Sequence, residues 1–141
     1  MIDFSDNILA ESIKRGAILH SYMFRNIDHG KFFVVVGVSE DKVAGFFFIN
    51  SKINKHLERS QELLNAQILI RKGNYSFLSH DSFICATRFI EIKVSEIIAS
   101  IRKEETKFID DLDEEDIENV LKFVRGSNLF SKNTIVKYAN R

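Results

Sequence analysis

Two apolar runs carry the strongest structural signal in this chain: Lys-Phe-Phe-Val-Val-Val-Gly-Val at residues 31–38 and Val-Ala-Gly-Phe-Phe-Phe-Ile at 43–49. β-Branched and aromatic residues favour strands, and the four polar residues between the two runs suit a turn. A third apolar run at 17–24 precedes them, across the turn-forming residues 26–30. Three apolar runs joined by short turns predict an antiparallel meander.

These runs are apolar on both faces of the predicted sheet, which favours a sheet curved around a core over one with a solvent-facing side. Glycine inside a strand marks a bulge or a sharp bend, and Gly37 and Gly45 occupy such positions. Further strands are predicted at 66–71 and 83–92. The strands are therefore expected to form a small curved antiparallel barrel over about residues 16–92.

The hydrophobic period changes after the last predicted strand, where apolar residues recur at the spacing of a helix face. These residues are Val94, Ile97, Ile98 and Ile101. A second helix is predicted over 113–125, because Asp113 is a good N-cap, acidic residues follow it and Gly126 is a natural stop. Strands first and helices last predict a single α+β domain over 1–141, helical from about 93–141.

Composition excludes several classes of protein. The chain has 141 residues, one Cys and four His. One Cys excludes a disulfide framework and a Cys-rich zinc site, and the histidines lack the paired spacing of a metal site, so neither a metal nor a cofactor is expected. No apolar run reaches the ~18 residues of a membrane span, and the N-terminus lacks the form of a signal peptide. A cytoplasmic protein without a membrane partner is the expectation.

The net charge of zero hides an uneven distribution. Residues 104–118 contain nine acidic residues and one Lys, so the rest of the chain is basic overall. This basic excess is too dispersed to predict nucleic-acid binding by itself, which needs a clustered basic face, but it is compatible with a phosphate-binding surface. Helix capping and solvation are sufficient to explain the acidic stretch.

A guanidinium interrupts the apolar face of the predicted strand at 83–92. The residues that share this face in a regular strand are Ile84, Ala86, Arg88, Ile90 and Ile92. Because a buried charge is costly unless it is paired, three interpretations stay open. Arg88 forms an ion pair with Glu91 or Asp81, extends to solvent at a barrel rim, or binds an anion.

Two groups of polar side chains lie at the ends of the meander strands. They are Arg25, His29 and Lys31 around the first turn, and Asn50, Ser51 and Lys52 at the end of the third strand. Both groups face one cleft if the hairpin curls over the barrel mouth, and ordinary turn polarity is the alternative explanation. Ser-His-Asp-Ser at 79–82 is predicted to be a polar turn in which Asp81 or Ser82 caps backbone N–H groups.

The order of these segments resembles the MazF/PemK-like toxins of type II toxin–antitoxin pairs. In that family a strand opens at an Arg-Pro pair and runs through an apolar stretch to a Ser, and the next strand ends in Thr or Ser. Residues 31–39 and 45–51 follow this pattern, and Cys-Ala-Thr-Arg-Phe-Ile-Glu-Ile at 85–92 resembles the family's Asp-Gln-(Ile/Val)-Arg-x-(Ile/Val)-Asp strand. The similarity covers about residues 14–101.

The resemblance implies an SH3-like curved sheet, a homodimer, an antitoxin protein as partner, and growth inhibition by metal-independent cleavage of single-stranded RNA. Such cleavage activates a ribose 2′-OH against the neighbouring phosphate and needs a base, a cation and an acid. Arg88 is the expected cation, Ser51 positions the backbone or the 2′-OH, and either His29 or Glu91 transfers protons. The residues expected to contact RNA are Lys31, Arg25, Lys52, Tyr22 and Phe24, the two aromatic rings by stacking on bases.

The chain also departs from the family pattern. Lys31 and Phe32 replace the Arg-Pro pair, and Cys85 and Ala86 replace Asp-Gln. A fold can be shared while an activity is altered or lost. The alternative function is therefore a non-catalytic SH3-like module that binds protein or nucleic acid.

Overall fold

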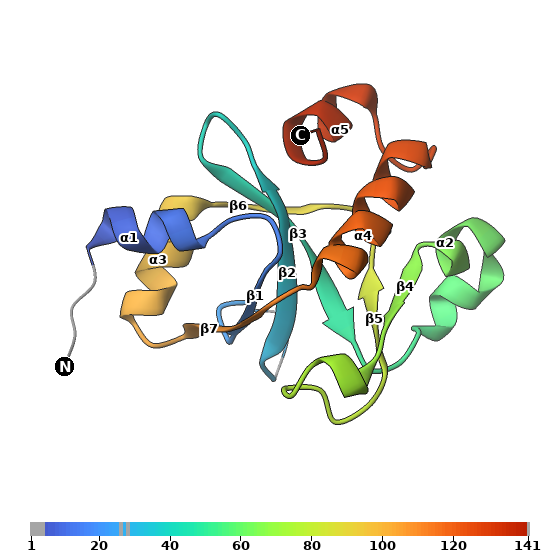
Figure 1. Cartoon of the computed structure of the whole chain (residues 1–141), viewed down its shortest axis with the longest axis horizontal. Helices are drawn as coiled ribbons and strands as arrows, with labels where there is room; N and C mark the ends of the chain where they lie inside the picture. Colours follow the sequence, from blue (N-terminus) through green and yellow to red (C-terminus); the bar gives the residue numbers. More distant parts are fainter. Residues whose placement is uncertain (1–4, 26, 28, 141) are drawn as a thin grey trace.

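The computed structural model describes residues 5–25, 27 and 29–140. It is an α+β structure in which helices pack on a seven-stranded antiparallel sheet of order β4-β5-β3-β2-β1-β7, with β6 also paired to β3 (Figure 1). The strands are β1 (Ala17–Ser21), β2 (Lys31–Val38), β3 (Val43–Asn50), β4 (Gln67–Ile70), β5 (Ser82–Cys85), β6 (Ile90–Lys93) and β7 (Thr106–Asp111). The helices are α1 (Asp6–Ser12), η1 (Lys55–Arg59), α2 (Gln61–Asn65), η2 (Lys72–Asn74), α3 (Val94–Arg102), α4 (Glu114–Gly126) and α5 (Lys132–Tyr138). Crossing a membrane would require a longer and more apolar helix than any in this described part of the chain.

The predicted antiparallel meander is confirmed in β1, β2 and β3. Ser21 of β1 lies opposite Lys31 of β2, and Phe32 of β2 lies opposite Ile49 of β3. Runs of Val and Phe form these strands because their stiff or flat side chains pack well on a pleated surface. The beginning of β2 and the end of β3 therefore lie side by side.

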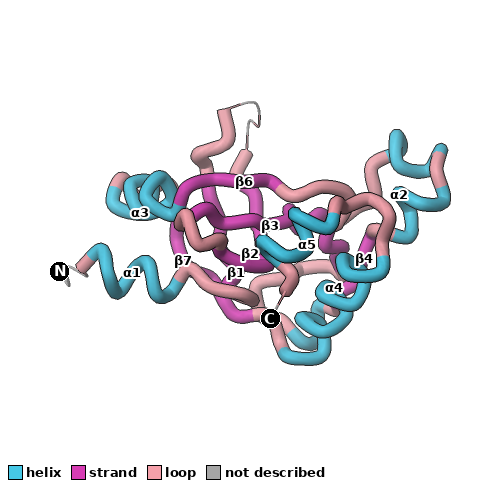
Figure 2. Tube along the Cα trace, turned by 90° about the horizontal axis from the view of Figure 1, so that it is seen from above, coloured by secondary structure: helices cyan, strands magenta, loops and turns pink. Residues whose placement is uncertain are grey.

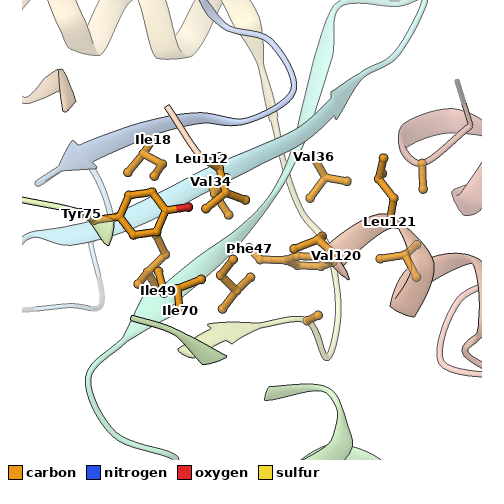
Figure 3. Packing of buried hydrophobic residues seen from close by; sticks show 14 residues of the cluster. Ile18, Val34, Val36, Phe47, Ile49, Ile70, Tyr75, Leu112, Val120 and Leu121 are labelled. Carbon is orange, nitrogen blue, oxygen red and sulfur yellow. The ribbon is translucent and has the colours of Figure 1, made fainter. Parts of the chain in front are cut away.

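The sheet is not closed into a barrel, so the expected barrel over about 16–92 is wrong: β4 and β7 are the two ends of the strand order. Helices α4 and α5 cover one face and α1 and α3 the other (Figures 1 and 2). Successive residues of a strand point to opposite faces, so Phe46 joins the cluster under α1 and α3, whereas Phe47 joins the cluster under α4 and α5. Figure 3 shows Phe47 within the second of these clusters. Helices on both faces explain why the strands are apolar on both sides.

The long strand predicted at 83–92 is interrupted. Its two halves, β5 and β6, both pair with β3, but residues 86–89 between them leave the sheet as a turn. The ring of Phe89 in this turn stacks on Phe47, with 4.4 Å between ring centroids, and so joins the core under α4 and α5. Arg88 is exposed, and the apolar row with a buried guanidinium that a regular strand would give does not form.

Both predicted helices after residue 93 are confirmed. Helix α3 begins at Val94, and α4 follows Asp113, whose side chain accepts the N–H of Asp116 at 2.9 Å. Between them, part of the acidic stretch forms β7, which pairs with β1 and had no counterpart in the sequence-based expectation. The chain from 93 onward is therefore not entirely helical.

Helix α5 is held on the sheet by Tyr138. Gly37 and Gly45 lie opposite one another in β2 and β3, and a Cβ added to Gly45 would be 2.6 Å from Cγ of the Tyr138 ring. The Tyr138 hydroxyl donates to Glu91 at 2.6 Å, and the Arg15 guanidinium donates to the Tyr138 carbonyl at 3.1 Å. The register of the β2–β3 pair does shift at Gly37, but these glycines also make room for this tyrosine.

Candidate functional site

A cavity of about 530 Å³ lies at the end of the sheet where the arrow of β3 ends in Figure 1. Strands β2 and β5 both run antiparallel to β3, so their first residues meet the last residues of β3 at the same end of the sheet. The described residues that line the cavity are His29, Gly30, Lys31, Phe32, Ile49, Asn50, Ser51, Lys52, Ile53, Asn54, Phe77, Leu78, Ser79, His80 and Ser82. We call this space the end cavity.

The ionisable side chains of the described lining are two lysines and two histidines. They are Lys31, Lys52, His29 and His80, and none of the described lining residues is acidic. A concave surface lined by one sign of charge concentrates ligands of the opposite sign. The end cavity is therefore suited to an anion.

Lys31 is the best-fixed cation of the end cavity. Its side chain is half-buried, its Nζ donates to Oδ1 of Asn50, and the same nitrogen lies 5.1 Å from the centroid of the Phe48 ring. Burial lowers the pKa of the Lys31 ammonium, and the nearby Cys85 acts in the opposite direction. An ammonium has three N–H donors, so one bond to Asn50 leaves it able to bind an anion as well.

The segment 80–82, which carries His80, is held by hydrogen bonds to nearby backbone groups. Oδ1 of Asp81 accepts the N–H of Lys72 at 2.9 Å, as predicted for a capping residue of this turn. Ser82 does not cap an N–H group, because its hydroxyl donates to the His80 carbonyl at 3.0 Å. Together these bonds fix the backbone at His80 and at the two residues that follow it.

Aromatic rings lie at the base and beside the end cavity. Phe32 and Phe77 both line it, with 5.0 Å between their centroids. Tyr22 is 64% exposed, and a Cβ added to Gly30 would be 3.0 Å from its Cε1 atom. The same Cβ would be 2.2 Å from Cε1 of His20, so only glycine allows this close approach. Tyr22 therefore flanks the cavity with a ring open to solvent.

His29, Lys31, Ser51 and Lys52, which sequence analysis nominated for RNA chemistry, line this one cavity together. Five of the six residues in the two polar groups at the ends of the meander strands thus line one cavity, although no barrel mouth creates it. Arg25 is exposed in the turn that precedes His29 and is not a lining residue.

Arg88 does not line the end cavity. The expected grouping of Arg88 with Lys31 and Ser51 in one hollow is wrong, because the strand that was to carry Arg88 breaks at the turn 86–89. Glu91, one of the two acids considered as its partner, instead accepts the hydroxyl of Tyr138.

Glu91 and Phe24 also lie outside the end cavity. Glu91 is on β6, and besides the bond from Tyr138 it lies 3.5 Å from Nζ of Lys137. Phe24 packs edge-on against Phe48, with 4.9 Å between centroids, in the cluster under α1 and α3. Glu91 is engaged with α5 and Phe24 with the core, and neither residue lines the end cavity.

The sequence did not nominate His80, Ser79 or Phe77, which complete the end cavity. The signal that would have found them is strand pairing, because a strand starting near residue 83 and antiparallel to β3 brings the preceding residues next to Asn50. Apolar runs predict strands but not which edge they join, so this pairing was not predictable from residue pattern alone.

Among the residues that the structure describes, no group of three or more His, Cys, Asp or Glu side chains is arranged to hold a metal ion. Comparison of the chain with protein-family models and with curated proteins gives no match.

Proposed function

We propose that this chain is an endoribonuclease that cleaves single-stranded RNA in the end cavity without a metal ion. The observation that carries the proposal is the convergence of Lys31, Lys52, His29 and His80 in a cavity whose described lining contains no carboxylate. Such a lining attracts a phosphodiester, and it lacks the carboxylate ligands that Mg²⁺ prefers. Imidazoles supply proton transfer near neutral pH.

The substrate class follows from the remaining groups. A cavity of about 530 Å³ falls within the usual range for small-ligand sites and has room for a nucleotide unit. The hydroxyl of Ser51 and the amide of Asn50 are suited to a ribose 2′-OH, and the exposed ring of Tyr22 offers a surface for an unstacked base. Unstacked bases and accessible 2′-OH groups are properties of single-stranded RNA.

The resemblance to MazF/PemK-like toxins supports the same activity. We propose both that the chain is related to these toxins and that its sheet has their SH3-like curvature. The residue roles change, since Lys31 and Lys52 take the place of Arg88 as cations and Glu91 is left out. Arg25, in the turn before His29, is kept as an outer phosphate contact. The proposed biological setting is a cytoplasmic, homodimeric growth inhibitor that an antitoxin protein neutralises.

A non-catalytic binding module is the second candidate. Arg88, which matches the Arg of the family motif, lies outside the end cavity, and this observation favours binding without cleavage. The two candidates share the phosphate-binding lining and differ only in whether the RNA chain is cut.

The test uses the purified full chain and a labelled single-stranded RNA of mixed sequence, in buffer with a chelator. We expect saturable binding and fragmentation, and we expect Lys31→Met to weaken binding and to lower the slope of log K against log salt by about 1. Lys122→Met is the matched control, because Lys122 is exposed on α4 outside the end cavity.

Binding without fragmentation would select the binding module over the nuclease. Absence of binding at low salt, or an equal loss in the Lys31 and Lys122 variants, would contradict both candidates. Induced expression followed by growth and total RNA tests the toxin setting separately, with arrest and RNA fragmentation as the expected result.

A further inference from the structure

We propose that His29 and His80 are the pair that transfers protons when RNA is cleaved in the end cavity. This inference rests on the proposed function and adds to it the two groups that move protons and the products that they generate. His80 was assigned no role by the sequence, and only the fold brings it into one cavity with His29.

The two imidazoles come from opposite sides of β3. His29 precedes β2 and His80 precedes β5, and these two strands are the neighbours of β3 on its two edges. Neighbouring strands are about 4.8 Å apart, so the first residues of β2 and β5, two residues after the histidines, are separated by about 10 Å across the end of β3. Side chains reaching inward from both sides can flank a phosphate held between them.

The middle of this arrangement holds the cation. Lys31 begins β2, and its Nζ is bound to Asn50 at the end of β3, between the two histidine-bearing segments. Ser51 and Lys52 follow Asn50 directly and also line the end cavity. The segments that carry the two histidines therefore lie on either side of the end of β3, and we place the phosphate of the substrate between them, where an in-line displacement needs its base and its acid.

The proposed cleavage needs no reactant other than the RNA and the side chains of the end cavity. The ribose 2′-oxygen attacks the adjacent phosphorus, and one neutral imidazole accepts the 2′-OH proton. The bond between phosphorus and the 5′-oxygen breaks, and the other imidazole, which is protonated, gives its proton to that oxygen. Lys31 and Lys52 offset the charge that gathers on the phosphate oxygens. The products are a 2′,3′-cyclic phosphate and a 5′-hydroxyl end.

Asp81, the residue after His80, does not make this a hydrolase triad. Its carboxylate accepts the backbone N–H of Lys72, so it holds the turn. The Ser82 hydroxyl donates to the His80 carbonyl and is likewise engaged with the backbone. His80 therefore acts through its exposed imidazole on a bound ligand and not through its sequence neighbours.

The experiment compares His29→Gln and His80→Gln with His56→Gln in the full chain. His56 is exposed in η1 and is not a lining residue of the end cavity, so it is the matched control. The substrate is a labelled DNA strand that contains one ribonucleotide, with the all-deoxy strand as the uncleavable analogue. We expect each end-cavity variant to lose cleavage by about 100-fold or more while binding to the all-deoxy strand is kept.

Two further readouts separate proton transfer from a structural role. The wild-type rate is expected to be bell-shaped in pH, and each single variant is expected to lose one limb of the bell. The upstream fragment is expected to end in a 2′,3′-cyclic phosphate.

Cleavage that persists in both end-cavity variants at the rate of His56→Gln would overturn the pair while leaving the nuclease proposal intact. Wild-type binding without cleavage would overturn the pair and select the binding module. A wild-type chain that binds neither strand would overturn the pair together with the proposed function.

Discussion

Lys31 begins β2 next to the end of β3. Its position at a strand end is the kind of feature that a residue pattern can predict. The residue pattern placed His29, Lys31, Ser51 and Lys52 at strand ends, and these strand ends meet at the end cavity. Arg88 was misplaced, because its burial was inferred from an unbroken strand and the strand breaks at 86–89. The position of a polar residue at a strand end was predictable from sequence. Whether a strand continues depends on core contacts, such as the stacking of Phe89 on Phe47.

His20, which closely approaches Gly30 beside the end cavity, makes the stability of the protein pH-dependent. Burial, and then the charge of Lys107, lower its pKa from the ordinary 6.5. The folded state thus binds the proton less tightly than the unfolded state, so the free energy of unfolding rises with pH from the lowered pKa up to 6.5. Below both pKa values the protein is expected to be less stable than at neutral pH.

The measurement is an NMR titration of the imidazole, together with urea unfolding from about pH 5 to neutral pH. We expect the His20 titration below pH 6.5, moved toward 6.5 in Lys107→Met and unmoved in Lys103→Met. A His20 titration above 6.5 would contradict this account.

At the scale of elements, the long apolar runs and the capped helix α4 were predictable because their signals are local. Strand β7 was not, because Lys107, Asp110 and Asp111 give it the polarity of a solvated segment, and only its pairing with β1 makes it a strand. The break between β5 and β6 was missed for the opposite reason, because residues 83–92 are mostly apolar and resemble one continuous strand.

Tyr75 links the segment that leads to Phe77 of the end cavity with the beginning of helix α4. Its buried hydroxyl donates to Asp116 at 2.6 Å and accepts the backbone N–H of Asp113 at 3.0 Å. Tyr75→Phe removes both bonds and leaves the Asp116 carboxylate and the N–H of Asp113 without this partner, so we expect a loss of about 1–3 kcal/mol in the free energy of unfolding. Urea unfolding measures it.

Tyr22→Phe is the control, since Tyr22 is 64% exposed. A surface change of this kind is expected to stay within about 0.5 kcal/mol. Equal stability of the Tyr75 and Tyr22 variants would refute the claim that this hydroxyl anchors α4.

Gly45 leaves the space in which the Tyr138 ring of α5 packs against the sheet. The Cβ of an alanine here would be 2.6 Å from Cγ of the Tyr138 ring, in a fully packed region, so Gly45→Ala is expected to cost about 1–3 kcal/mol and to loosen α5. Thermal unfolding measures the cost, and faster trypsin cleavage after Lys137 reports the loosening.

Gly73→Ala is the control, because nothing lies within 4 Å of the Cβ that it would add. Equal unfolding temperatures of the two variants would show that the space at Gly45 is not needed to hold Tyr138. Unchanged resistance of α5 to trypsin in Gly45→Ala would show the same.

At the scale of the whole molecule, strands that are apolar on both faces fit two architectures, a closed barrel or an open sheet between helices. Helices α1 and α3 cover one face and α4 and α5 the other, and the sequence alone did not say which surfaces they would cover (Figure 2). Because helices occupy both faces, the groups available for a ligand gather at the end of the sheet, where loops of β2, β3 and β5 meet.

The central claim is that this end of the sheet binds RNA. The most direct test is titration of a short single-stranded oligoribonucleotide into the ¹⁵N-labelled full chain, with amide shifts followed by NMR. We expect saturable shifts concentrated in residues 29–32, 49–54 and 77–82, with the turn at 86–89 unaffected. Shifts centred on that turn and Glu91, or no saturable shift at low salt, would contradict it.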